Sequence, residues 1–292
     1  MSEFGLIGYP IEHSQSPELF KLAYQGKYGY DLIEGKYFEE SYAKFKKGYK
    51  AINVTAPFKE QAFEKADIVS GPATLIGAAN ILVKTGNGVS AHNSDFTGVI
   101  LTVAENLFPG IIDEFYTTFG AEAHKKIHQF VKASIEKRYE RKPEALIVGL
   151  GGAGKAAAVA AAEMGFTTSV MNRTAKKAEE FSKSLPEYKF NILALEDFSK
   201  TLSHSDLVIY ALPMALESFQ SLGANDFKRG QIILEANYRD PAFCALTLAR
   251  ALDGGAKYIP GNVWLACQAI SGYSLMTGEA PDVQALLEGF SI

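Results

Sequence analysis

The fold of this chain is decided by the stretch Glu144-Ala-Leu-Ile-Val-Gly-Leu-Gly-Gly-Ala-Gly154. An apolar run leads into a glycine-rich turn, and an alanine-rich run then continues to Gly165. That order predicts a buried strand, a tight turn and a helix. Because glycine has no side chain, the backbone of such a turn can approach a pyrophosphate, and the N–H groups that open the helix can receive its charge. The stretch therefore predicts a unit that binds a dinucleotide.

The next predicted strand, over residues 167–171, indicates which dinucleotide is bound. It ends where the adenosine ribose should lie, and a site for NAD normally has Asp or Glu at that point. This chain has Asn172-Arg173-Thr174 instead. Arginine can stack on adenine and pair with a 2′-phosphate, and threonine can donate its hydroxyl. The loop therefore favours NADP over NAD; the alternative is that Arg173 is merely a solvated loop residue.

Strand-like and helix-like runs alternate over the N-terminal part of the chain. Strands are predicted over 4–8, 31–37, 50–53 and 88–92, and helices over 17–28, over 39–46 and from Pro57 onward. Such alternation predicts a mainly parallel sheet covered by helices. Further strands are predicted over 206–211 and 231–236, and two helices over 262–277 and 281–290. The chain is therefore expected to be an α/β protein.

Lys59 lies in the first turn of the helix predicted after Pro57, near the positive end of its peptide dipoles. An ammonium is destabilised there, and such a group suits acid/base work. For a lone lysine, a solvated surface position is the plainer interpretation. Asn93-Ser94-Asp95 follows the strand over 88–92, however, and Asp95 could supply the carboxylate that holds the ammonium.

Several segments together carry a resemblance to a known family. They are Gly8-Tyr-Pro-Ile-Glu-His-Ser-Gln-Ser-Pro17, Asn53-Val-Thr-Ala-Pro-Phe-Lys59, Gly77-Ala-Ala-Asn80, Asn93-Ser-Asp95, the turn over 149–154, Asn172-Arg-Thr174 and Gly261-Asn-Val-Trp-Leu-Ala-Cys-Gln268. In this order the segments resemble the shikimate dehydrogenase family over nearly the whole chain. The resemblance implies two domains: a discontinuous α/β substrate-binding domain over 1–97 and 262–292, and a Rossmann-like NADP-binding domain over 98–261.

The family implies an NADP-dependent oxidoreductase that reversibly reduces 3-dehydroshikimate to shikimate, a step of aromatic amino-acid biosynthesis. By the resemblance, Lys59 and Asp95 are catalytic. The residues expected to contact the substrate are these two with Ser14, Ser16, Thr55, Asn80, Ser94, Tyr238 and Gln268. The residues expected to contact NADP are Gly149, Gly151, Gly152, Ala153, Gly154, Asn172, Arg173, Thr174, Ala211 and Gly261. Ser16 could also simply cap the helix that it precedes.

Two other functions remain open. A quinate/shikimate dehydrogenase, or a relative acting on another cyclohexene acid, would keep the same core residues. A non-catalytic sensor would keep the pocket without turnover. Its only support is the loop Tyr210-Ala-Leu-Pro-Met-Ala-Leu216, where the family commonly has Asn-Ala-Thr-Pro beside the cofactor. Glu235 also stands where the family usually has Asp, ahead of Tyr238.

The segment over about 105–142 lies outside the resemblance and is predicted to add a helical hairpin to the dinucleotide-binding domain. His124 and His128 fall on one face of a helix there, but no third metal ligand is evident. No metal site is therefore expected.

Composition is consistent with these expectations. At 292 residues, with 47% apolar and 21% charged residues, the chain can form two domains with large cores. Its net charge of −4 gives no electrostatic reason to expect a nucleic acid or an anionic membrane as partner. The first residues lack the pattern of a signal peptide, and the 2 cysteines form neither a disulfide framework nor a zinc motif. A cytoplasmic monomer or homodimer is expected.

Overall fold

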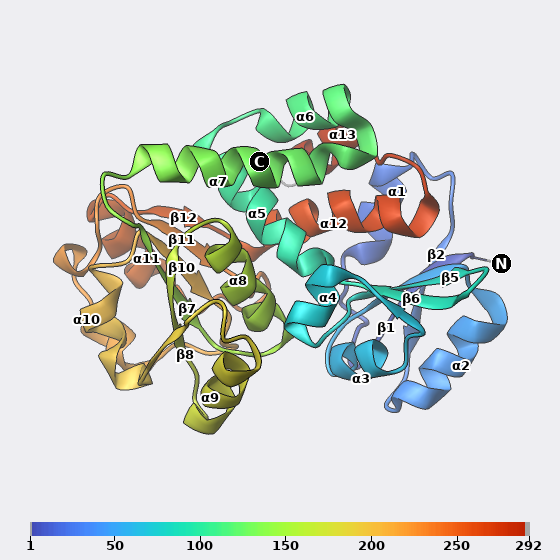
Figure 1. Cartoon of the computed structure of the whole chain (residues 1–292), viewed down its shortest axis with the longest axis horizontal. Helices are drawn as coiled ribbons and strands as arrows, with labels where there is room; N and C mark the ends of the chain where they lie inside the picture. The colour runs from blue at the N-terminus through green and yellow to red at the C-terminus, as the bar shows by residue number, and fades with distance from the viewer. Residues whose placement is uncertain (1, 290–292) are drawn as a thin grey trace. The chain divides into compact units, whose positions relative to one another are not determined.

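The computed structural model describes residues 2–289 and divides the chain into two compact units (Figure 1). The first unit contains the residues up to Ile127 together with those from Leu265 onward. The second unit runs from His128 to Trp264. Each unit contains one six-stranded sheet, which confirms the α/β class.

The sheet of the first unit has the order β2-β1-β3-β5-β6-β4. Its strands are β1 (Phe4–Gly8), β2 (Tyr30–Glu34), β3 (Ala51–Val54), β4 (Ile68–Val69), β5 (Ile81–Thr85) and β6 (Gly88–His92). β1 pairs in parallel with β2 and β3, and β4 pairs in parallel with β6. β5 is antiparallel to both β3 and β6, and a short turn after Thr85 joins β5 and β6 in a hairpin. The sheet is therefore mixed, and β1, β3 and β6 all end at the edge where β5 begins.

The helices predicted in the first unit begin and end at different residues in the structure, and the helices over 71–76 and 94–107 were not predicted. The helices of this unit are α1 (Ser16–Ala23), α2 (Phe38–Gly48), α3 (Lys59–Glu64), α4 (Gly71–Ile76), α5 (Ser94–Leu107), α6 (Ile111–Phe119), most of α12 (Gly261–Thr277), and α13 (Val283–Glu288). α1 ends before residue 28 because Gln25 has a φ of 52° in the left-handed region. α3 begins two residues after Pro57 because the Phe58 amide first closes a turn onto the Thr55 carbonyl at 3.0 Å.

The helices α5 and α12 of the first unit cross closely. A Cβ added to Gly98 on α5 would lie 2.7 Å from Cβ of Gln268 on α12, and one added to Gly272 would lie 2.8 Å from Oγ of Ser94. Glycines at these two places therefore allow α5 and α12 to pack closely, as Figure 1 shows. α5 therefore belongs to the first unit, and the observed division lies after Ile127, whereas the sequence predicted a boundary after residue 97.

The segment outside the family resemblance forms helices, as predicted. α6 is followed by a 3-10 turn, η1 (Gly120–Glu122), and by α7 (Ala123–Arg138). α6 belongs to the first unit and packs against α5 and α13, so the prediction that the whole hairpin lies on the dinucleotide-binding domain differs from the structure. Four apolar side chains of α7 at helical spacing are 0% exposed: Ala123, Ile127, Val131 and Ile135.

The sheet of the second unit has the order β12-β11-β10-β7-β8-β9, and all of its pairs are parallel. Its strands are β7 (Glu144–Val148), β8 (Thr167–Met171), β9 (Asn191–Leu193), β10 (Leu207–Tyr210), β11 (Ile232–Glu235) and β12 (Lys257–Ile259). Its α-helices include α8 (Gly152–Glu163), α9 (Ala175–Ser184), α10 (Phe198–Leu202) and α11 (Ala245–Asp253). The strand order reverses between β7 and β10, and sheets of this kind bind ligands at the carboxyl ends of the strands at such a point.

The core of the second unit lies against this sheet and is rich in aromatic residues, with Phe198, Tyr210, Phe219 and Phe243 at its centre. Within residues 2–289, no single helix has the length and apolar character needed to cross a membrane, and only the bent pair of α5 and α6 meets those limits when its helices are counted together.

Candidate active site

The strand directions of the first unit bring distant residues to one edge of its sheet. β3 and β6 end at this edge, and the loops that follow them carry Lys59 and Asp95. β5 begins at the same edge, and Asn80 directly precedes it. The predicted catalytic residues therefore gather at one place although they lie far apart in the sequence.

Lys59 and Asp95 form a partly buried ion pair. Nζ of Lys59 lies 2.5 Å from Oδ2 of Asp95, and their side chains are 18% and 8% exposed. Asp95 lies in the first turn of α5, where the N–H groups favour a carboxylate. The Asn93 side chain caps this helix by accepting a bond from the Phe96 amide at 3.3 Å. A partly desolvated pair interacts more strongly than one in open water, so Asp95 can hold the ammonium in a fixed position.

Asn80 binds Oδ1 of Asp95, whereas Lys59 binds Oδ2. Asn80 is 3% exposed, and its Nδ2 lies 3.0 Å from Oδ1 of Asp95, 3.0 Å from Oγ of Ser94 and 2.9 Å from Oε1 of Gln268. Its Oδ1 accepts a bond from the Ser94 amide at 2.8 Å. An amide nitrogen carries two hydrogens, so these three acceptors share them. The two Asp95 oxygens are thus divided between Asn80 and Lys59.

Ser14, Ser16 and Thr55 follow β1 and β3 at the same edge, and each is partly buried. Oγ of Ser14 lies 3.1 Å from Oγ of Ser16 and accepts a bond from the Ser16 amide at 3.2 Å. Ser16 does not cap α1, because the cap position is Gln15. Two neighbouring hydroxyl groups can both donate to a carboxylate, so their arrangement suits the role that the family resemblance implies.

Tyr238 lies in the second unit, on the loop between β11 and α11. The Asn237 side chain ties this loop together by donating to the Asp240 carbonyl at 2.6 Å and by accepting bonds from the Arg239 and Asp240 amides. Burial raises the pKa of Tyr238, so its phenol is neutral at neutral pH.

Glu235, the last residue of β11, binds the far end of the same loop. It is 0% exposed, and its carboxylate accepts bonds from the Ala242 amide, from the Phe243 amide at 3.4 Å and from the Tyr258 hydroxyl at 2.6 Å. These donors satisfy the buried carboxylate. The longer Glu, in place of the family's usual Asp, therefore has a structural role that the sequence did not reveal.

The glycine-rich turn after β7 fits a pyrophosphate. Gly149 has a φ of 98°, in the left-handed region that favours glycine. A Cβ on Gly154 would lie 1.9 Å from the carbonyl oxygen of Gly149, so only glycine allows the turn to close. Gly151 precedes α8, and the N–H groups of its first turn, at Gly152 and Ala153, have no partner inside the helix. These donors are the groups that an anionic ligand requires.

The loop after β8 lies beside this turn. Oδ1 of Asn172 accepts a bond from the Leu150 amide at 3.1 Å, and its Nδ2 donates to the Thr174 carbonyl at 3.0 Å. Asn172 thus links the glycine-rich turn to the loop that carries Arg173 and Thr174. Arg173 is exposed, and its guanidinium forms no ion pair with the residues that the structure describes. It is available to a phosphate.

The two remaining predicted cofactor residues lie in different places. Ala211 directly follows β10, and its amide donates to the Val148 carbonyl at 2.7 Å, so it adjoins the glycine-rich turn. Gly261 opens α12, and a Cβ there would lie 2.7 Å from the Ala236 carbonyl oxygen.

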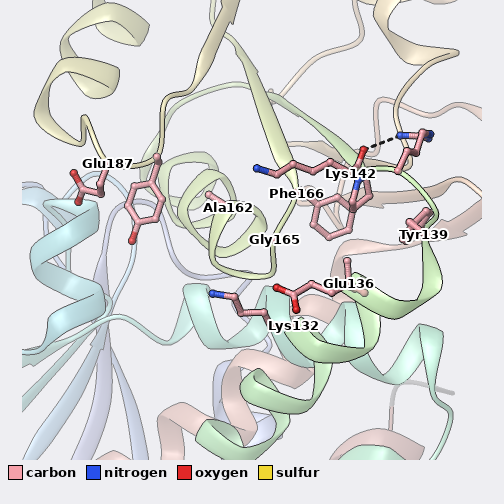
Figure 2. A pocket seen from close by; sticks show the side chains of 12 residues that line it. Lys132, Glu136, Tyr139, Lys142, Ala162, Gly165, Phe166 and Glu187 are labelled. Atoms are coloured by element: carbon pink, nitrogen blue, oxygen red, sulfur yellow. Dashed lines mark hydrogen bonds between the residues drawn. The ribbon is translucent and has the colours of Figure 1, made fainter.

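A pocket of about 520 Å³ lies near the amino ends of β7 and β8 in the sheet of the second unit (Figure 2). Pro143 and Phe166, which directly precede β7 and β8, form part of its wall, and α7 contributes Lys132 and Glu136. The amino ends of parallel strands are not where dinucleotides bind, so this pocket is distinct from the predicted cofactor site. Within residues 2–289, no three His, Cys, Asp or Glu side chains are grouped so that they could hold a metal ion.

Two family models match separate parts of this chain. Residues 6–82 match the family model described as the shikimate dehydrogenase substrate binding domain, and residues 132–219 match the one described as shikimate / quinate 5-dehydrogenase. Together the two matches cover more than half of the chain. The first contains Lys59 and Asn80, and the second contains the glycine-rich turn and Arg173.

Similar proteins match along the whole chain. A shikimate dehydrogenase (NADP(+)) of Natronomonas pharaonis is 28% identical, with 99% of this chain and 98% of that protein covered. One of Pyrococcus abyssi is 29% identical, with 98% and 96% covered. The crystal structure of shikimate 5-dehydrogenase from Thermus thermophilus in complex with shikimate has a TM-score of 0.75 at 25% identity, with 99% of this chain and 97% of that chain covered. The chain therefore belongs to the shikimate dehydrogenase family.

Proposed function

We propose that this protein is an NADP-dependent shikimate dehydrogenase that reversibly reduces 3-dehydroshikimate to shikimate. The observation that carries the proposal is the Lys59–Asp95 pair, whose Nζ and Oδ2 atoms lie 2.5 Å apart at one edge of the sheet of the first unit. Lys59 lies within the region that matches the substrate binding domain, residues 6–82. The names of the similar proteins supply the substrate and the cofactor. The ion pair supports Lys59 as the proton donor of this reaction.

The chemistry explains why a lysine and a carboxylate should lie together. Reduction of a ketone builds negative charge on the carbonyl oxygen, so a proton must reach that oxygen. NADPH, when bound, supplies the hydride. Lys59 donates the proton from Nζ, and in the reverse direction the neutral amine accepts the proton of the substrate hydroxyl. Asp95 fixes the direction of Nζ and accepts a hydrogen bond from a neighbouring substrate hydroxyl.

The other substrate residues bind and orient the ring. Ser14 and Ser16 donate to the substrate carboxylate, and Tyr238 lines the ring. Asn80 holds the carboxylate of Asp95, and the remaining positioning residues are Thr55, Ser94 and Gln268. Because Asn80 contacts both Ser94 and Gln268, these side chains form one hydrogen-bonded group. Holding a substrate in the reactive geometry lowers the entropic part of the barrier.

The cofactor residues divide into two groups. The turn over 149–154 receives the pyrophosphate through backbone N–H groups, and Asn172 keeps the neighbouring loop in place. Arg173 and Thr174 bind the 2′-phosphate that distinguishes NADP from NAD. Ala211 and Gly261 border the remainder of the dinucleotide.

A four-way assay tests this proposal. Reduction of NADP⁺ and of NAD⁺ is followed spectrophotometrically with shikimate and with quinate. We expect shikimate with NADP⁺ to be the best pair. A higher kcat/KM for quinate would instead favour the quinate/shikimate dehydrogenase that the second family description includes. Binding of shikimate and NADP⁺ without any turnover would establish the non-catalytic sensor.

We also infer a cytoplasmic location. Cys244 is exposed and Cys267 is buried, and both are free thiols, as a reducing compartment maintains. The protein is expected to be a monomer or a homodimer, and light scattering of the purified protein distinguishes the two.

A further inference from the structure

Tyr210 anchors the loop that follows β10. Its ring is 0% exposed and packs edge-on against Phe198 and Phe243, at angles of 77° and 89°. Its hydroxyl donates to the Met214 carbonyl at 2.6 Å. A buried hydroxyl requires a partner, and here the partner is Met214, in the exposed middle of the loop over 211–216. The core thus holds the loop through the bond to Met214, through a backbone hydrogen bond between Leu216 and the Tyr210 hydroxyl, and through the packing of Leu212 and Leu216.

The same loop lies against the glycine-rich turn. A Cβ added to Gly149 would lie 3.0 Å from Cδ2 of Leu212 and 3.0 Å from the carbonyl carbon of Ala211. The loop and the turn follow the neighbouring strands β10 and β7, where the strand order reverses. A displacement of the loop therefore changes the space beside the turn.

The sheet order indicates which part of the cofactor uses that space. The adenosine ribose is placed at the end of β8 and the pyrophosphate at the turn after β7. The nicotinamide half must then extend to the opposite side of the turn, toward β10. The loop over 211–216 therefore borders the nicotinamide half.

We propose that Tyr210 is a positioning residue for the cofactor, which fixes the loop over 211–216 against the nicotinamide half through the Met214 carbonyl. The proposal rests on the proposed function. The family commonly has Asn at position 210 and Thr at position 212, so this chain has lost two polar side chains beside the cofactor. In place of the two polar side chains, the buried Tyr210 holds the loop in position from the core. The backbone of the loop then borders the nicotinamide half.

The test compares Tyr210→Phe with Tyr116→Phe. Tyr210→Phe keeps the packed ring and removes only the bonds of its hydroxyl to the Met214 carbonyl and to the Leu216 backbone. We therefore expect the KM for NADP⁺ to rise about fivefold, within the range for losing neutral hydrogen bonds. The KM for shikimate and kcat should each stay within about twofold of the original values, because the loop belongs to the cofactor site. Tyr116 is a matched control: it is 8% exposed, and its hydroxyl has no hydrogen-bond partner among the described residues. Tyr116→Phe should leave all three constants unchanged.

Three results would overturn the proposal. The first is an unchanged KM for NADP⁺ in an active Tyr210→Phe protein, with the unchanged NADPH affinity verified by fluorescence titration. The second is an equal loss in both KM values and in kcat with a lower melting temperature, which would show a general structural role. The third is an unmodified protein that binds no NADPH, which would refute the proposed function and this inference together. The first two leave the proposed function intact, so the two failures are distinguishable.

Discussion

Nζ of Lys59 lies 2.5 Å from Oδ2 of Asp95 although 36 positions separate the two residues. The sheet makes this approach possible because β3 and β6 run in the same direction with β5 between them. Asn80, which directly precedes β5, then binds the second oxygen of Asp95 at 3.0 Å. The position of the ion pair therefore depends on the strand order and on the hydrogen bond from the buried side-chain amide of Asn80.

Asp95→Asn should impair the reaction without unfolding the protein. The amide keeps the shape of the carboxylate but loses the charge that holds Lys59, so kcat/KM for shikimate should fall roughly 10- to 100-fold, the effect of losing a hydrogen bond to a charged group. Steady-state kinetics measure the loss. Asp113→Asn, the same change at an exposed position of α6, is the control. Full activity of Asp95→Asn would show that the ion pair has no part in the reaction.

Arg173→Asp should change the cofactor preference. A carboxylate would repel the 2′-phosphate, so the KM for NADP⁺ should rise roughly 10- to 100-fold, while the KM for NAD⁺ changes little. Lys183→Asp makes the same change of charge in the last turn of α9, away from the loop, and should leave the ratio of the two KM values unaltered. If the unmodified protein already uses NAD⁺ much better than NADP⁺, the assignment of this loop is incorrect.

Much of the fold can be predicted from the spacing of apolar residues and from the turn residues between them. The strands over 88–92 and 167–171 were predicted at the residues where β6 and β8 lie, because their apolar runs are bounded by turn residues. β5 was not predicted, although the hairpin that it forms with β6 places Asn80 beside Asp95. Short strands such as β4 and β12 were also missed, since two or three residues carry no periodicity.

The site was predictable mainly through the family's motifs, and its supporting contacts were not. Gly98 and Gly272 allow α5 and α12 to cross, but nothing in their local sequence indicates a helix contact. The buried bonds of Glu235 and Tyr210 depend on partners that are close only in the folded chain. Tertiary packing, which local patterns do not encode, therefore decides the details of both loops.

Asp206 should make stability depend on acid pH. It is 4% exposed and binds Lys228, the Glu144 amide at 2.9 Å, and Arg141, whose Nη2 lies 2.7 Å from both of its oxygens. Burial alone would raise the pKa of Asp206, but these donors together hold it below its ordinary value. Because the folded pKa is the lower one, the stabilisation is complete above about pH 4 and is lost as the pH falls through the folded pKa.

Asp206→Asn should therefore lower the free energy of unfolding at neutral pH by about 1–3 kcal/mol, with a smaller difference at strongly acid pH. Urea denaturation at the two pH values measures both differences. Asp253→Asn, at the exposed end of α11, serves as the control. An equal effect of Asp206→Asn at both pH values would contradict the linkage.

The two cysteines should differ in reactivity. A hydrogen bond with Thr247 lowers the pKa of exposed Cys244, whereas burial raises the pKa of Cys267 to about 12. Only the thiolate is a good nucleophile, so iodoacetamide at neutral pH should modify Cys244 alone in the folded protein and both residues in urea. Mass spectrometry of the peptides measures this, with Cys244→Ser as the control. Comparable labelling of Cys267 in the folded protein would show that its surroundings open readily.

The turnover of Lys59→Ala tests the central claim most directly. If Lys59 supplies the proton, kcat should fall roughly 10²–10⁴-fold with a smaller change in the KM for shikimate. Lys59→Met, which keeps much of the side-chain stem, should be equally impaired. Lys65→Ala, just after the end of α3 at a side chain that is 45% exposed, should retain normal turnover. A folded Lys59→Ala protein whose kcat lies within about threefold of the original, well below the range for losing an acid/base group, would contradict the account.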